Sequence, residues 1–108
     1  MVSKIDRRAG PRVAARLPVK LRAAESEMTA ETRDVSTHGI FLFIQSRLAE
    51  GSNLELVLML PPELTAGRKC WVCCHARVLR VERAAAGNRF GVAAQIQRID
   101  ILPEISGV

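Results

Sequence analysis

Aromatic residues are scarce in this sequence of 108 residues, which has no tyrosine, one tryptophan and three phenylalanines. The apolar content is still 48%. That is enough for one packed core, which we expect to be aliphatic. The aromatic positions are Phe41, Phe43, Trp71 and Phe90. Most of them fall on strand faces predicted to be apolar, so the sequence offers no evident platform for stacking nucleic-acid bases.

Cysteine is also rare, and its three positions, Cys70, Cys73 and Cys74, lie in one short segment. An odd number of cysteines argues against a disulfide framework. Residues three apart on a strand point to opposite faces, so Cys70 and Cys73 cannot converge on one metal ion. We therefore expect these side chains to pack in the core and predict no metal site.

No apolar run is long enough to cross a bilayer, and the N-terminus has no apolar segment typical of a secretory signal. These absences favour a cytoplasmic protein without membrane insertion. The sequence also shows no nucleophile–base pair, metal cluster or phosphate-binding loop, so an enzyme or a bound cofactor is not expected.

The dominant hydrophobic period is two residues rather than 3.6. It predicts six strands with turn residues between them, over about 13–22, 28–35, 40–44, 54–60, 69–83 and 90–97. Pro18 suggests an edge or a bulge in the first strand, and the alternation blurs near Arg80, where a second bulge is expected. Such a pattern is typical of an antiparallel all-β barrel or sandwich. We divide the chain into an arm (1–12), a β domain (13–100) and a short tail (101–108).

Positive charge gathers at the N-terminus of this chain, whose net charge is +5. The first 22 residues hold seven Lys or Arg side chains and one acid. Residues 1–12 have no strand pattern and are predicted to form a flexible basic arm. Such an arm attracts an anion, which could be a nucleic acid, a nucleotide or an acidic protein surface.

Two short polar motifs stand out from this background. Arg8 and Arg12 are separated by three residues in the arm, and Asp34, Ser36 and Gly39 precede a strongly apolar run. Arginine forks bind phosphates and guanine acceptor edges, and a carboxylate accepts hydrogen bonds from guanine N–H groups. Each motif alone also has a simpler interpretation, as a solvated basic tail or as turn-capping residues.

Strand pairing should bring the two motifs together. A hairpin turn centred near Glu25 places Asp34 opposite Arg16 and Ser36 opposite Ala14, within a few residues of register error. The arm with Arg8 and Arg12 then enters at the same end of the hairpin. We therefore predict one polar pocket, with cations on a mobile arm and acceptors at the end of a fixed strand.

These motifs resemble those of the PilZ domain family of bacterial cyclic-di-GMP receptors. The family pattern is RxxxR in an N-terminal arm, then D/N-x-S-x-x-G at the end of the second strand. Arg8 and Arg12 match the first motif, and Asp34, Ser36 and Gly39 match the second without substitution. The segment 89–93 also resembles the last barrel strand of the family. The resemblance covers residues 5–100 and implies a six-stranded antiparallel split barrel, with little or no C-terminal helix in this chain.

The resemblance also implies roles for the site residues. Arg8 and Arg12 would hold the phosphates and contact guanine, Asp34 and Ser36 would bind guanine edges, and Gly39 would let the backbone approach. Arg7 precedes the first motif, and a basic residue there accompanies two stacked ligand molecules in the family. His38 could approach the ligand, although an exposed turn residue is the more ordinary role.

The function that we expect is a cytoplasmic cyclic-di-GMP receptor domain in second-messenger signalling. Its arm would order on the ligand and present a changed surface to an unidentified effector protein of motility, pili or exopolysaccharide synthesis, and an oligomer is compatible with this role. The alternatives are a small basic barrel that binds nucleic acid and a PilZ-type interaction domain that binds no nucleotide. Stable binding of nucleic acid is not expected.

Overall fold

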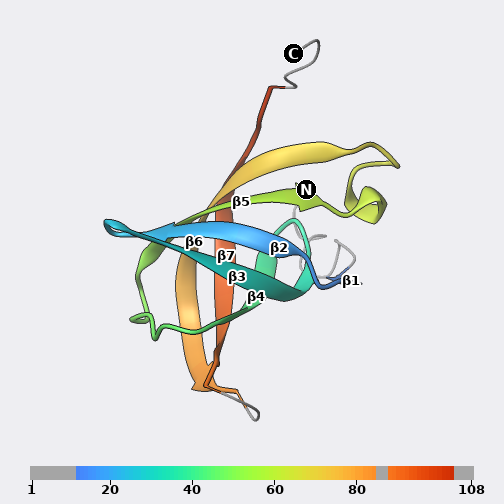
Figure 1. The fold of residues 1–108 in the computed structure, drawn as a ribbon. Helices are drawn as coiled ribbons and strands as arrows, with labels where there is room; N and C mark the ends of the chain where they lie inside the picture. The colour runs from blue at the N-terminus through green and yellow to red at the C-terminus, as the bar shows by residue number, and fades with distance from the viewer. Residues whose placement is uncertain (1–11, 85–87, 104–108) are drawn as a thin grey trace, which may run out of the picture.

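The computed structural model describes residues 12–84 and 88–103. Its elements are β1 (Val13–Ala14), β2 (Pro18–Ala23), β3 (Ser26–Val35), β4 (Gly39–Ile44), β5 (Asn53–Leu60), the 3-10 turn η2 (Pro62–Leu64), β6 (Cys70–Arg83) and β7 (Phe90–Ile101) (Figure 1). Each predicted strand is present, and the last one extends to Ile101. In the described ranges, no helix has the length and apolar character needed to span a membrane.

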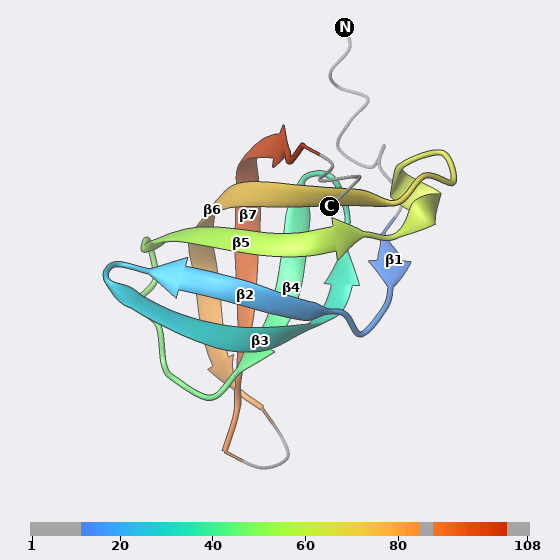
Figure 2. The same cartoon turned by 45° about the horizontal axis from the view of Figure 1, so that its top comes forward.

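The strands form one closed antiparallel barrel. The sheet order is β1-β3-β2-β5-β6-β7-β4, and the additional pairing of β3 with β4 closes six strands into a ring. Figure 2 shows β2, β3 and β5 crossing the front of the barrel, with β4 and β7 behind them at a steep angle. The predicted six-stranded antiparallel barrel is therefore confirmed, with β1 as a short seventh strand beside β3.

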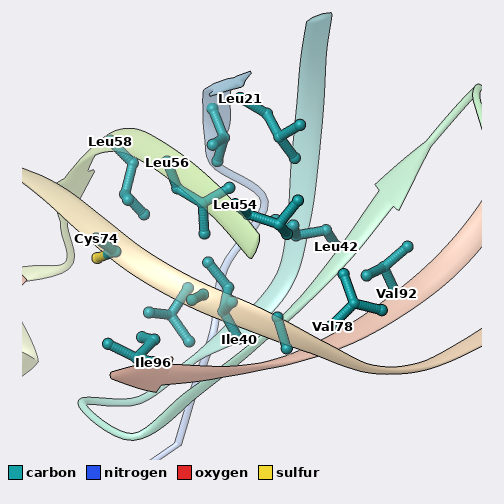
Figure 3. Close-up of a cluster of buried hydrophobic side chains, with 14 of the residues drawn as sticks. Leu21, Ile40, Leu42, Leu54, Leu56, Leu58, Cys74, Val78, Val92 and Ile96 are labelled. Atoms are coloured by element: carbon teal, nitrogen blue, oxygen red, sulfur yellow. The ribbon is translucent and has the colours of Figure 1, made fainter. Parts of the chain in front are cut away.

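The barrel interior is aliphatic, as its composition predicted. Alternate residues of every barrel strand point inward, for example Leu54, Leu56 and Leu58 on β5 and Cys74 and Val78 on β6 (Figure 3). None of these five side chains is more than 2% exposed. Burial of this apolar surface stabilises the barrel and holds the strand ends in fixed positions.

The predicted first strand is interrupted. Residues 15–17 separate β1 from β2, and Pro18 is the first residue of β2. β2 is not an edge strand, since it pairs with both β3 and β5. The pairing with β5 begins at Lys20, so the missing N–H of Pro18 costs no ladder hydrogen bond.

The observed register differs from the predicted one by two residues. One residue arises because the hairpin turn is centred between residues 24 and 25, and the other arises from this interruption. Asp34 lies opposite Ala14 rather than Arg16, and Val35 lies opposite Val13. From Ala14 to Pro18 the chain advances four residues, while β3 advances three between Asp34 and Glu31. The pairing register therefore shifts by one residue between β1 and β2. The predicted hairpin turn is correct, because Ala23 pairs with Ser26 around residues 24–25.

The expectation that all three cysteines pack in the core is only partly correct. Cys74 is fully buried and Cys70 packs against the core cluster. Cys73 instead alternates to the outer face, where its sulfur lies 3.9 Å from His75 Nε2. The strand period explains this difference, since Cys73 and Cys74 are neighbours in β6 and must point to opposite faces.

Candidate functional site

The end of β3, the turn into β4 and the short strand β1 meet at one corner of the barrel (Figure 2). Val13 and Ala14 pair with Val35 and Asp34, so β1 carries the end of the basic arm directly to the Asp-x-Ser motif. Residues 12 and 34 are thereby neighbours in space.

Arg12 binds both polar residues of the second motif. Its Nε donates to Asp34 Oδ1 at 2.6 Å, and its Nη1 donates to Ser36 Oγ at 3.3 Å. Asp34 is only 8% exposed, while half of the Arg12 side chain is accessible. Because the carboxylate is buried and the guanidinium is exposed, the ion pair holds Arg12 in place. The guanidinium can still leave Asp34 for another anion, and the carboxylate can then accept from another donor.

Ser36 also closes the turn that follows β3. Its hydroxyl oxygen accepts hydrogen bonds from the backbone N–H groups of His38 and Gly39, at 3.2 and 3.0 Å. The turn-capping interpretation of this serine therefore holds together with its contact to Arg12. His38 itself is exposed and lies beside Thr37 Oγ1.

Gly39 begins β4 opposite Gln95 and needs no positive φ. A Cβ atom built there would lie 3.5 Å from Arg12 Nη1 and 3.5 Å from the carbonyl oxygen of Ala94. Those are ordinary contact distances, so a side chain could be accommodated by the barrel itself. It would, however, occupy the surface next to the arginine of the motif.

Arg33 is a site residue that the sequence patterns did not indicate. A β-bulge lies between Thr32 and Asp34, where Thr32 pairs with Leu42 and Asp34 pairs with Phe41. Arg33 is the additional residue. It therefore shares a side of the strand with Asp34, and its Nε donates to Asp34 Oδ2 at 2.6 Å.

The bulge also explains how β3 changes from a polar strand to a core strand. Met28 and Ala30 pack against the interior and Thr32 is fully buried, which is the regular alternation. After the extra residue, Val35 rather than Asp34 points into the core. Asp34 is thereby left on the outer face with its carboxylate free to receive two guanidinium groups.

The expectation that most aromatic residues lie on apolar faces agrees with the burial of Phe41 and the partial burial of Phe43 and Phe90, and Trp71 is the exception. Phe41 and Phe43 alternate with the core residues of β4 and lie outside the core cluster, with arginines over their rings. Trp71 is 51% exposed on β6. Phe90 packs against the core as expected. The sequence did not indicate that Phe41 and Phe43 point outward, because the outward residues of β4 are as hydrophobic as its inward ones.

Two of the predicted ligand-binding residues, Arg7 and Arg8, lie outside the described residues. Of the predicted set, the structure brings Arg12, Asp34 and Ser36 into direct contact and places Gly39 beside them. The site is an open polar surface. The cavities of about 470 and 580 Å³ that adjoin Met28 and Ser46 lie elsewhere.

A second group of titratable side chains lies on the outer face of β6 and β7. His75 Nε2 is 3.1 Å from Asp100 Oδ2, and Arg98 donates to the same oxygen at 3.0 Å, which lowers the pKa of Asp100. Within the described residues, no three His, Cys, Asp or Glu side chains are arranged to hold a metal ion.

Comparison with known proteins agrees with this architecture. The sequence model for the PilZ domain matches residues 6–102. The structure of Bacillus subtilis Inhibitor of motility (MotI/DgrA) superimposes with a TM-score of 0.68 at 24% identity, over 88% of this chain and 44% of that one. The PilZ domain of CeSA from a cellulose-synthesizing bacterium gives 0.51 at 22% identity, over 79% of each chain. The chain thus spans less than half of MotI/DgrA, and no curated protein matches it significantly.

Proposed function

The chain belongs to the PilZ domain family, and from that premise we propose that it is a receptor domain for cyclic-di-GMP. The observation that carries the proposal is the contact of Arg12 with both Asp34 and Ser36. Arg12 of the first family motif is separated from Asp34 and Ser36 of the second by more than twenty residues in sequence, yet these three side chains are in contact. This polar surface offers cations for phosphates and acceptors for guanine N–H groups.

Ligand binding would exchange partners at this surface. Arg12 is half exposed and would turn from Asp34 towards a phosphate or a guanine acceptor edge. Asp34 and Ser36, fixed at the end of β3 and in its turn, would then bind a guanine edge. Arg7 and Arg8 would join from the arm. The rearranged arm would be the signal that an effector protein recognises.

The direct test is calorimetric titration of the 108-residue chain with cyclic-di-GMP. We expect a dissociation constant in the micromolar range or lower for the wild-type chain. Arg12→Ala and Asp34→Ala should abolish binding while the melting curve of the free protein stays nearly unchanged. Arg22→Ala is the control, since Arg22 pairs with Glu27 at the far end of the β2–β3 hairpin. A wild-type chain that folds but does not bind the dinucleotide would falsify the proposal.

The same titration measures the stoichiometry. The family resemblance assigns two stacked ligand molecules to a basic residue at position 7. Arg7→Leu should therefore lower the stoichiometry from two to one. Equal stoichiometry in both proteins would remove this role from Arg7 without affecting the receptor function.

A further inference from the structure

Asp34 receives two guanidinium groups, but only one of them belongs to a family motif. Arg12 approaches Oδ1 and Arg33 approaches Oδ2, both through Nε at 2.6 Å. Arg12 comes from the segment before β1, whereas Arg33 lies within β3. One cation of the site is therefore attached to the arm and the other to the barrel.

The ring of Phe41 packs against the guanidinium group of Arg33. Its guanidinium carbon lies 3.9 Å from the centroid of the Phe41 ring, which is a close cation–π contact. Phe41 is only 5% exposed and lies against Gly91 of β7. A Cβ at position 91 would be 2.7 Å from Phe41 Cζ, so the ring occupies space that only a glycine leaves open. Phe41 and Asp34 together fix the guanidinium plane.

This fixed guanidinium still has capacity to bind something else. Within the described part of the chain, only Nε of Arg33 makes a hydrogen bond, and 54% of the side chain is accessible. Among these residues its terminal nitrogens donate to no acceptor, so they can bind a ligand at the accessible part of the side chain. A planar cation of this kind can stack on a nucleobase and donate to phosphate or to guanine acceptors.

We propose that Arg33 is a further ligand-binding arginine of the site, on which a guanine base stacks opposite Phe41. Arg33 also remains beside Asp34 when Arg12 turns towards the ligand, so the carboxylate keeps one cationic neighbour throughout. The inference rests on the proposed cyclic-di-GMP function and adds a binding residue that neither motif contains.

The chain offers a matched control for this residue. Arg89 repeats the arrangement one step along the strands, with its guanidinium carbon 4.7 Å from the Phe43 centroid and Nη1 3.3 Å from Glu31. Removal of either arginine deletes one cation, one ion pair and one aromatic contact. Of these two arginines, Arg33 contacts Asp34 and Arg89 does not, so the removal of Arg33 should weaken ligand binding much more strongly.

The experiment is titration of cyclic-di-GMP into the wild-type chain and four variants. Arg33→Ala should weaken binding at least tenfold, and Arg33→Lys should recover only part of the loss because an ammonium group cannot stack as a plane. Phe41→Leu should weaken binding while keeping every charge, and Arg89→Ala should stay within about twofold of wild type. Equal affinities of the Arg33→Ala and Arg89→Ala variants would overturn the inference and leave the receptor function intact.

A measurement without ligand separates the two proposals. The Nε–H signal of Arg33 in the NMR spectrum should be protected from exchange in the wild-type chain and lost in the Asp34→Ala variant. If the wild-type chain shows this protected signal but binds no cyclic-di-GMP, the receptor function and the ligand-binding role of Arg33 both fail. The contact of Arg33 with Asp34 is then still confirmed. If the signal is absent but the dinucleotide binds, only the role of Arg33 is overturned.

Discussion

The geometry of this site depends on single groups, such as one buried hydroxyl and the absence of a methyl group at two glycines. Thr32 is fully buried, and its hydroxyl accepts a hydrogen bond from the Leu17 N–H at 2.9 Å and donates to the Ala15 carbonyl. It therefore joins β3 to residues 15–17, which lie between β1 and β2. That connection positions the segment that carries Arg12.

Thr32→Val tests this connection. The substitution keeps the shape of the side chain but leaves the Leu17 N–H and the Ala15 carbonyl without their partner. We expect a loss of about 1–3 kcal/mol in the free energy of unfolding, measured by urea denaturation. Thr29→Val, on the exposed face of the same strand, should change it by less than about 0.5 kcal/mol. Equal effects of the two substitutions would contradict the bridging role.

Two glycines of the site predict opposite outcomes for the same change. Gly91→Ala places a methyl group 2.7 Å from Phe41 Cζ, which forces the ring to move and should lower the free energy of unfolding by about 1–3 kcal/mol. Gly39→Ala meets only ordinary contacts at 3.5 Å, so the barrel should keep its stability while the surface beside Arg12 is obstructed. Thermal melting and ligand titration of both variants measure the two effects. A stable Gly91→Ala variant with an unchanged Arg33 Nε–H signal would contradict the proposed role of this glycine.

Among the strands, sequence periodicity predicted each barrel strand but, of the irregularities at Arg33, near Arg80 and at residues 15–17, only the bulge near Arg80. The bulge near Arg80 was predicted, and the structure places Leu79 there as the additional residue between two paired positions. An outward leucine breaks the alternation visibly. The bulge at Arg33 could not be predicted, because both neighbours, Thr32 and Asp34, are polar. An extra charged residue between them does not disturb the alternation of apolar and polar residues.

The interruption between β1 and β2 was hidden for the opposite reason. Apolar residues continue to alternate through residues 13–21, although the ladder is broken at 15–17. The meeting of Arg12 with Asp34 was still predicted correctly. Hairpin topology fixes which end the arm enters, and a register error of two residues does not change that end.

The β2–β3 hairpin turn contains a strained residue. Ala24 has φ of +56°, a region that costs a residue with a Cβ atom about 1 kcal/mol or more. Ala24→Gly should therefore raise the free energy of unfolding by about 0.5–1 kcal/mol, seen as a higher melting temperature. Glu25→Gly is the matched control, because Glu25 has no positive φ and glycine there only adds freedom to the unfolded chain. Stabilisation by Glu25→Gly would contradict this account of the turn.

At the scale of the whole molecule, one buried thiol links the integrity of the barrel to pH. Cys74 is fully buried in the core, and desolvation raises its pKa from an ordinary 9.0 to about 11. The neutral thiol is the form that the fold favours. Its contribution is therefore complete below about pH 9 and is lost as the pH rises towards 11, because the unfolded chain releases a proton that the folded chain retains.

Cys74→Val isolates this contribution, since valine packs in the same space and cannot ionise. The other titrating groups are present in both proteins, so their effects cancel in the difference. Between pH 8 and pH 11, the wild-type chain should lose about 2–3 kcal/mol more of its free energy of unfolding than the variant, measured by urea denaturation under reducing conditions. Parallel pH profiles for the two proteins would mean that the Cys74 thiol can ionise inside the folded barrel, which requires that water reaches the core where the structure shows close packing.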